Sequence, residues 1–525
     1  MSTYGPRRPS VASISDFLIV GGGTNGLSAA AYLGKEGYST IVLERQQYLG
    51  GGAVTKEITL PGFKHDVFAT SINLWKASSI QQDLELEKYG YREASPDPVA
   101  STPFKNGKAI TIYRDLNATL KSIAQFSKKD AEKYKEVFQF FIESKDILLG
   151  SLESAPVPFS TMMSALEESD TGLDFLQFSY LSARDWLEEN FESEEMRAFL
   201  ALWGSNHVPL SPEDAGSAIL ILVFIGILQD KGAGVPLGGM ATLVSALSSF
   251  VEAHGGRTVT GEEVIGIIVH DGRATGVRTQ SGKIFEAKRG VIASVEPKSL
   301  FLKLVPDFAL DQSFKKKVSS YRYSKVTEVM IHAALDDWFD YKPKETRRAG
   351  LVQIGDSLNQ ISRAYNDCVM GQPPLQPFMT IDNTTCYDST RAPSGKHIMW
   401  NFVRAPVFVN GKPWADDLRE SFADRCIQRL SEYAPNASKI ILKRVVYSPQ
   451  DLERVNPNLV YGDPGAGKAT LDQSLALKPF PGWSEYRTPV KGLYMCSPAN
   501  HPGGGVSGLA GHNAVLTVLH DLGTS

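Results

Sequence analysis

The chain has 525 residues, of which 42% are hydrophobic, and a formal net charge of -4. This length supports a large buried interior and roughly three structural units, while the mildly acidic charge excludes the broad basic surface of a nucleic-acid-binding protein. The cysteines lie far apart and form no CxxC pair, so we expect a reducing, cytoplasmic location and no disulfide framework, metal site or redox-active dithiol from Cys368, Cys386, Cys426 and Cys496.

The first predicted elements form a βαβ unit between residues 17 and 54. Residues 1–16 carry no apolar run, so we expect a disordered tail there and not a signal peptide. Residues 17–20, FLIV, predict a short buried strand, and Gly21-x-Gly23-x-x-Gly26 follows at once and opens a helix. A second apolar strand at 40–43 ends in Glu44.

This order is typical of a dinucleotide-binding unit. Gly21 allows the tight turn, Gly23 lets a diphosphate approach the backbone, and Gly26 lets the helix pack against the strand. The helix N-terminus would face the diphosphate, and Glu44 would bind the ribose hydroxyls, which favours FAD or NAD over NADP. A plain glycine-rich turn is the alternative. The predicted cofactor contacts here are Gly21, Gly22, Gly23, Thr24, Asn25, Gly26 and Glu44.

The residues after Glu44 separate FAD from NAD. The segment ERQQYLGGGAVT resembles the E-R-x-x-x-x-G-G-x-x-x-T extension of FAD enzymes with the glutathione-reductase-type fold, particularly the amine oxidase and phytoene desaturase group. The resemblance implies that this segment covers the diphosphate and ribityl chain, with contacts from Arg45, Gly51, Gly52, Ala53 and Val54. Without the resemblance, three consecutive glycines indicate only a loop.

The longest apolar run is AILILVFIGIL at residues 218–228, which is too short to span a bilayer. It predicts a buried helix or tunnel wall, and a peripheral membrane contact is the alternative. Residues 75–230 have helical patterns, whereas residues 300–455 mix strands, such as 327–334 and 398–403, with a helix near 417–433. Aromatic residues either line an apolar pocket or belong to the core: Phe63, Phe68, Trp75, Trp203, Phe224, Trp400 and Phe402.

A second organised block begins at Gly238 and runs to residue 297. A helix is followed by strands at 257–260, 264–269, 274–279, 284–287 and 291–294. This order resembles the second part of the FAD domain in the same fold, where Val264 would meet the adenine through its backbone. An unrelated β-meander domain is the alternative.

A segment at residues 462–468, GDPGAGK, matches the start of a phosphate-binding P-loop. Ala469 stands where the magnesium-binding Ser or Thr is required, so we reject ATP binding.

The C-terminal block predicts a strand at 492–495, a glycine-rich loop at 500–508 and a helix at 509–522. The positive end of such a helix favours electron acceptance by a flavin. The segment GLYMCSPANHPGGGVSGLAGHNA resembles the ending of phytoene-desaturase-like FAD oxidoreductases. The chain departs from them at Ser497, which replaces a glycine, and at Lys478-Pro479, where they often have Arg-Pro. The resemblance implies flavin contacts from Pro502, Gly503, Gly504, Gly505 and Val506.

The expected fold is α/β, with a discontinuous glutathione-reductase-type FAD-binding Rossmann domain and an interleaved α+β substrate domain. The FAD-binding parts would be 17–74, 231–299 and 456–525, and the substrate parts 75–230 and 300–455. His501 is the catalytic candidate, since an imidazole beside the flavin loop can exchange protons, although it could instead only hydrogen-bond the loop backbone. The pair His65 and Asp66 is a second candidate, and it could equally order a turn.

The expected function is FAD-dependent dehydrogenation (desaturation) or isomerisation of an apolar or unsaturated small molecule, such as a polyene or carotenoid-like compound. No second dinucleotide unit follows, so we expect oxygen, a quinone or another acceptor to reoxidise the flavin. Two alternatives remain: a flavin amine or amino-acid oxidase, and a flavin-free prenyl-binding escort protein of the same fold.

Overall fold

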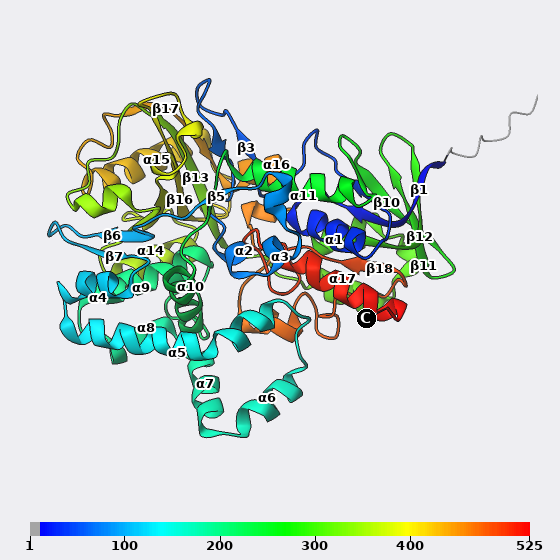
Figure 1. Ribbon diagram of the computed structural model, residues 1–525, viewed down its shortest axis with the longest axis horizontal. Coiled ribbons are helices and arrows are strands. Elements are labelled where there is room, and N and C mark those ends of the chain that lie inside the picture. Colours follow the sequence, from blue (N-terminus) through cyan, green and yellow to red (C-terminus); the bar gives the residue numbers. More distant parts are fainter. Residues whose placement is uncertain (1–10, 525) are drawn as a thin grey trace, which may run out of the picture.

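The computed structural model describes residues 11–524. Two seven-stranded sheets lie at opposite ends of the long axis, and helices and loops fill the region between them (Figure 1). The predicted tail at residues 1–10 lies outside the described residues.

The first sheet carries the predicted βαβ unit. Its order is β10-β11-β12-β1-β2-β9. The strand β18 is off this path and pairs with the C-terminal end of β12, beyond the residues that pair with β11. The strands β1, β2, β9, β12 and β18 run parallel, so their carboxyl ends meet at one edge, where open α/β sheets bind ligands. The strand bounds are β1 Val11–Val20, β2 Thr40–Leu43, β9 Arg257–Val259, β10 Val264–His270, β11 Arg273–Thr279, β12 Ile284–Ala293 and β18 Leu493–Met495.

Three helices form a layer on this sheet: α1 (Thr24–Lys35), α11 (Met240–Ala253) and α17 (Leu509–Leu522) (Figure 1). A Cβ atom at Gly511 would lie 2.0 Å from the carbonyl oxygen of Asn25, so this glycine lets α17 touch α1. The close helix contact brings the C-terminal block beside the N-terminal one.

Two sequence expectations were wrong in this sheet. Residues 11–16 are not a disordered tail, because they form the first part of β1 and pair with residues 284–287 of β12. The predicted strands 284–287 and 291–294 are one continuous strand, which pairs with β1 on both sides of a register shift at Lys288 and Arg289.

The second sheet has the order β17-β13-β16-β15-β14-β6-β7. The strands predicted at 327–334 and 398–403 are confirmed as β13 and β16, and the helix near 417–433 is confirmed as α15 (Asp416–Ser431). The bounds are β6 Ala100–Pro103, β7 Ala109–Ile112, β13 Val326–Leu335, β14 Leu351–Ile354, β15 Met379–Asp382, β16 His397–Pro406 and β17 Ile441–Tyr447.

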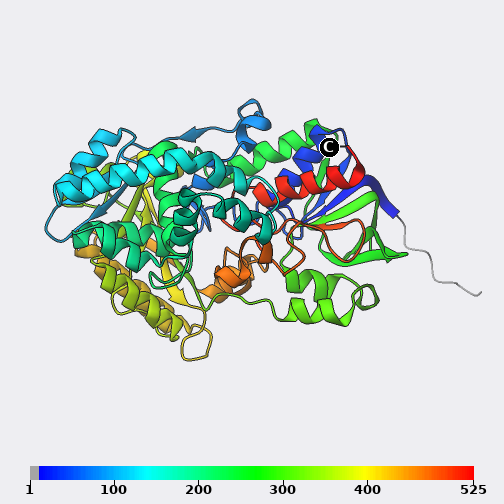
Figure 2. The same cartoon turned by 90° about the horizontal axis from the view of Figure 1, so that it is seen from below.

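The two faces of this sheet differ. Alternate residues of β13, such as Val329 and Ile331, share an apolar core with α15. Side chains on the other face of the sheet, such as Met330 of β13 and Phe402 of β16, face the region between the two sheets. Figures 1 and 2 both place the segment after α16 (Pro449–Val455), drawn in orange, in that middle region.

Helices between residues 116 and 230 pack against the β6, β7 and β14 part of the second sheet. The apolar run at 218–228 is a largely buried helix, as predicted. In the described residues no helix is both long and apolar enough to cross a membrane. The bounds are α4 Leu116–Ala124, α5 Lys128–Leu152, α6 Phe159–Glu167, α7 Asp170–Tyr180, α8 Ala183–Asn190, α9 Glu194–His207 and α10 Ala218–Asp230.

Short elements complete the chain. They are β3 Thr55–Lys56, β4 His65–Asp66, α2 Asn73–Ala77, α3 Ile80–Asp83, β5 Glu93–Ala94, β8 Val235–Pro236, α12 Pro297–Ser299, α13 Gln312–Ser319 and α14 Leu358–Val369. The boundaries between the FAD-binding and substrate parts stay a prediction, although each sheet draws its strands from the expected segments.

Candidate functional site

The glycine elbow between β1 and α1 contains two glycines with different constraints. A Cβ atom at Gly26 would lie 2.1 Å from the carbonyl oxygen of Gly21, so the protein itself requires glycine there. At Gly23 the nearest atom would be 3.6 Å away, so no protein atom excludes a side chain. The first turn of α1, which begins at Thr24 and Asn25, has no side-chain cap and no acidic residue. Its amide groups therefore remain available to an anion.

Glu44 lies beside the elbow at the carboxyl end of β2. It is 8% exposed, and its two carboxylate oxygens accept hydrogen bonds from the backbone N–H groups of Gly22 and Gln46, both at 2.8 Å. Burial raises its pKa, and these hydrogen bonds oppose that shift. The backbone of Glu262 also donates to the carbonyl of Glu44 at 2.9 Å, which brings Val264, at the start of β10, to the same edge.

The segment after Glu44 folds back over the elbow. The N–H of Gly50 donates to the carbonyl of Gly22 at 2.9 Å, and a Cβ atom at Gly51 would lie 3.0 Å from the Cα of Gly23. A Cβ atom at Gly52 would meet nothing within 4 Å, which leaves an open cradle of bare backbone. Ala53 and Val54 follow as buried residues, whereas Arg45 is half-exposed and pairs with Glu263 at 3.4 Å.

The glycine-rich loop before α17 packs tightly against other loops. A Cβ atom at Gly504 would lie 2.4 Å from the carbonyl oxygen of Pro464, and one at Gly505 would lie 2.9 Å from the Leu74 side chain. Protein packing therefore already explains these two glycines. Val506 has a φ of 54°, a strained conformation for a β-branched residue, and such strain concentrates at functional sites. Pro502 and Gly503 precede them in the same loop.

His501 is buried in front of this loop. Its Nε2 lies 2.8 Å from the carbonyl oxygen of Ser151 in α5, so the backbone hydrogen bond that the sequence allowed is present. Burial and, to a smaller extent, the charge of Lys478 lower the pKa of His501 to about 4. The imidazole is therefore neutral near pH 7, and its catalytic role stays a prediction.

His65 and Asp66 have structural contacts. The Asp66 carboxylate, 1% exposed, accepts hydrogen bonds from the backbone of Met240 at 2.9 Å and from Arg391 at 2.8 Å. Arg391 is itself fully buried, so the two form a buried ion pair. This pair ties the start of α11 to the loop before β16.

A buried charge cluster that the sequence did not reveal lies between the two sheets. Glu328 on β13 is 3.7 Å from Arg404 on β16, and the hydroxyl of Thr327 donates to the carbonyl of Gly462 at 3.0 Å, which brings in the adjacent loop. In that loop Asp463 accepts from the N–H groups of Gly465 and Gly467 at 2.8 and 3.2 Å. Two short 3-10 helices, Leu471–Gln473 and Leu475–Leu477, follow this loop, and the rejection of ATP binding stays a prediction.

Two members of the cluster are enclosed ionisable groups. Burial raises the pKa of Glu328 to about 7, and 12% of its side chain is accessible. Burial also lowers the pKa of Lys478 to about 8, and Lys478 keeps some accessible surface. Because a Cβ atom at Gly503 would lie 3.2 Å from the Lys478 Nζ, the ammonium group of Lys478 adjoins the glycine-rich loop.

Aromatic side chains on the inner face of the second sheet contact the segment after the elbow. Trp400 and Phe402 pack with Val54 and Phe68 in one apolar cluster. The Trp400 Nε1 donates to the carbonyl oxygen of Phe68 at 2.7 Å. Of the aromatic residues predicted as pocket or core, Phe68, Trp400 and Phe402 are buried, and they join the second sheet to the segment after the elbow.

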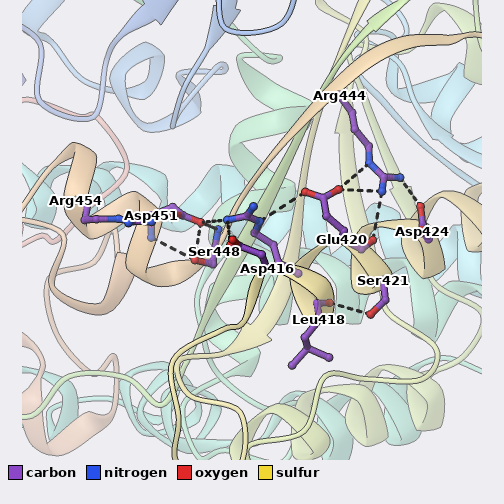
Figure 3. A network of polar contacts seen from close by, with 10 residues as sticks. Asp416, Leu418, Glu420, Ser421, Asp424, Arg444, Ser448, Asp451 and Arg454 are labelled. Atoms are coloured by element: carbon purple, nitrogen blue, oxygen red, sulfur yellow. Dashed lines mark hydrogen bonds and ion pairs between the residues drawn. The ribbon is translucent and has the colours of Figure 1, made fainter.

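A separate ionic network lies on the α15 side of the second sheet (Figure 3). Arg444 on β17 pairs with Glu420 at 3.0 Å and with Asp424 at 2.6 Å, and Arg419 pairs with Asp451 of α16 at 3.0 Å. A neighbouring groove of about 590 Å³ is lined mainly by charged and polar residues. Its lining does not suit an apolar substrate.

Comparison with known proteins gives the family. Residues 26–508 match the model of the flavin containing amine oxidoreductases. The chain is 32% identical to the rat pyridine nucleotide-disulfide oxidoreductase domain-containing protein 2, with 97% of this chain and 94% of that protein covered.

Two more distant relatives belong to bacteria. A component of the limonene dehydrogenase of Castellaniella defragrans is 26% identical over 97% of this chain and 95% of its own. The neurosporene-forming phytoene desaturase of Cereibacter sphaeroides is 22% identical over 97% and 96%. Among solved structures, an oxidoreductase from Methanosarcina mazei has the same fold, with a TM-score of 0.62, 16% identity, and coverage of 96% of this chain and 99% of that one.

These findings confirm the predicted α/β fold and the resemblance to phytoene-desaturase-like proteins. They also confirm FAD as the cofactor. The chain therefore belongs to the flavin containing amine oxidoreductase family and is an FAD-dependent oxidoreductase.

Proposed function

We propose that this enzyme dehydrogenates an apolar or unsaturated small molecule. The observation that carries the proposal is the aromatic inner face of the second sheet, where Trp400 and Phe402 meet Val54 and Phe68 next to the glycine elbow. An apolar substrate that lies beside this cluster would be stabilised by the removal of its surface from water. The relatives named as acting on limonene and phytoene support the same substrate class.

The elbow residues fit FAD. The diphosphate would lie at the uncapped start of α1, over Gly23 and under the bare backbone of Gly51 and Gly52. Glu44 would accept the ribose hydroxyls, because a carboxylate that already holds two N–H groups keeps further lone pairs. The remaining proposed contacts are Gly21, Gly22, Thr24, Asn25, Gly26, Arg45, Ala53, Val54, Val264, Pro502, Gly503, Gly504, Gly505 and Val506.

When bound, FAD supplies the two-electron acceptor of the reaction. The chain supplies the binding face, the exclusion of water and groups that hold protons. Glu328, with a pKa of about 7, and Lys478, with a pKa of about 8, can each gain or lose a proton near neutral pH. His501 stays our candidate for proton exchange beside the loop, through its Nδ1. Oxygen, a quinone or another acceptor would then reoxidise the cofactor.

Anaerobic bleaching of the flavin tests the proposal. The holoenzyme is mixed without oxygen with a panel of polyenes, retinoids, fatty acyl compounds and amines, and the yellow absorbance of oxidised flavin is followed. We expect an apolar or unsaturated compound to bleach it. Bleaching by amines alone would replace the proposal with amine oxidation.

A further inference from the structure

Arg404 is a buried cation whose hydrogen-bonding groups are not all used. It lies on β16, two residues beyond Phe402, and is 2% exposed. Its Nη2 donates to the carbonyl oxygen of Asn206, while its Nε and Nη1 have no hydrogen-bond partner. Because buried N–H groups of a charged side chain are costly to leave unpaired, this arrangement indicates that an acceptor is missing.

Other unpaired polar atoms lie on the same face of the second sheet as this arginine. The Oδ1 of Asn206 and the Oε1 of Gln353 also lack a partner. The Nδ2 of Asn206 donates to Thr380 at 2.6 Å, and the Nε2 of Gln353 lies 3.1 Å from the Nε2 of His207. Three elements, α9, β14 and β16, thus bring polar atoms without partners to one face of the second sheet.

The charges around Arg404 are only partly balanced. Glu328 approaches its Nη1 no closer than 3.7 Å, and burial together with Asp463 raises the pKa of Glu328 to about 7, against the effect of Arg404. The carboxylate of Asp463 in turn is shared between two cations, Arg404 and Lys478. On α9, His207 is neutral, because burial and Arg404 lower its pKa to about 3. Near neutral pH, Arg404 therefore keeps charge that an anion can neutralise.

We propose that the substrate carries a carboxylate, which Arg404 binds while the aromatic face holds its apolar part. Asn206 and Gln353 complete this subsite, since their free oxygens accept from a water molecule or hydroxyl that accompanies the carboxylate. The inference rests on the proposed function and narrows its substrate class to apolar or unsaturated carboxylic acids. Arg404 is thereby a specificity-determining residue.

Binding to the holoenzyme tests this inference without turnover. Straight-chain acids from butanoate to tetradecanoate and the matched primary alcohols are titrated, and the perturbation of the flavin spectrum and the shift in melting temperature are recorded. Since a hydrogen bond to a charged group is worth roughly 10- to 100-fold in affinity, we expect acids to bind about that much more tightly than the alcohols. Equal affinities would overturn the inference.

Substitutions test whether Arg404 is responsible for the preference for acids over alcohols. Arg404→Met should remove the preference for acids, whereas Arg444→Met, which removes a cation on the other face of the same sheet, should keep it. If Arg404→Met does not fold, Glu328→Gln tests the same assignment. This variant removes the carboxylate that competes for Arg404, so acids should bind more tightly and alcohols with unchanged affinity. A preference for acids that survives Arg404→Met, or acid binding that weakens in Glu328→Gln, would refute the assignment. If acids bind as expected but no compound bleaches the flavin, the proposed function fails and the subsite stands.

Discussion

Replacement of Gly23 by alanine separates the needs of the cofactor from those of the fold. The residue has φ -74° and ψ 173°, which alanine adopts freely, and no protein atom would lie within 3.6 Å of the new Cβ. We therefore expect the unfolding free energy of the apoprotein to change by no more than about 0.5 kcal/mol. A methyl group against the diphosphate costs about 1–3 kcal/mol, so FAD should bind roughly 5- to 150-fold more weakly.

Gly26→Ala is the matched comparison, because its Cβ would lie 2.1 Å from the carbonyl oxygen of Gly21. This overlap should destabilise the apoprotein itself by about 3 kcal/mol or more. Fluorescence titration with FAD and thermal melts with and without FAD measure both quantities for the two variants. If Gly23→Ala binds FAD with wild-type affinity, the diphosphate does not lie on Gly23. If its apoprotein is destabilised as strongly as Gly26→Ala, the glycine serves the fold.

Three further predictions concern the buried ionisable groups. His501→Gln should keep FAD bound but slow the reduction of the flavin about 100-fold in stopped flow, and an unchanged rate would leave this residue only a structural role. Arg391→Met should lower the unfolding free energy by about 3 kcal/mol in urea titrations, since it leaves Asp66 buried without its cation; a loss below about 1 kcal/mol would contradict that assignment. The affinity for carboxylic acids should fall above pH 7, by up to about tenfold per pH unit, because ionised Glu328 then competes for Arg404, and this slope should vanish in Glu328→Gln.

Local patterns predicted the parts of the fold that local chemistry determines. The strand at 40–43 and the helix at 509–522 have the expected bounds, because one is a fully buried apolar run and the other follows Gly508, whose φ of 71° ends the preceding loop. Residues 11–16 gave no such signal, since they are mostly exposed. Only their pairing with β12, far along the chain, makes them a strand.

The candidate site likewise has one part that the sequence predicts and one part that it does not. The elbow glycines and Glu44 belong to one short segment, so their proximity could be predicted from the sequence. The charge cluster could not, because His207, Glu328, Arg404, Asp463 and Lys478 come from five separate segments that meet only when the sheets pack. A weak signal existed, since Glu328 and Arg404 interrupt otherwise apolar strands. In the sequence, a charged residue of a buried strand has the same pattern as a charged residue of a strand exposed to solvent.

The most direct test of the proposed function is a single anaerobic turnover with equimolar holoenzyme and the compound that bleaches it. The product is identified by mass spectrometry. We expect one flavin to be reduced for each substrate molecule that loses two hydrogen atoms and keeps its carboxylate. Replacement of an amine by oxygen in the product, or a flavin that no compound in the panel reduces although dithionite does, would contradict the account.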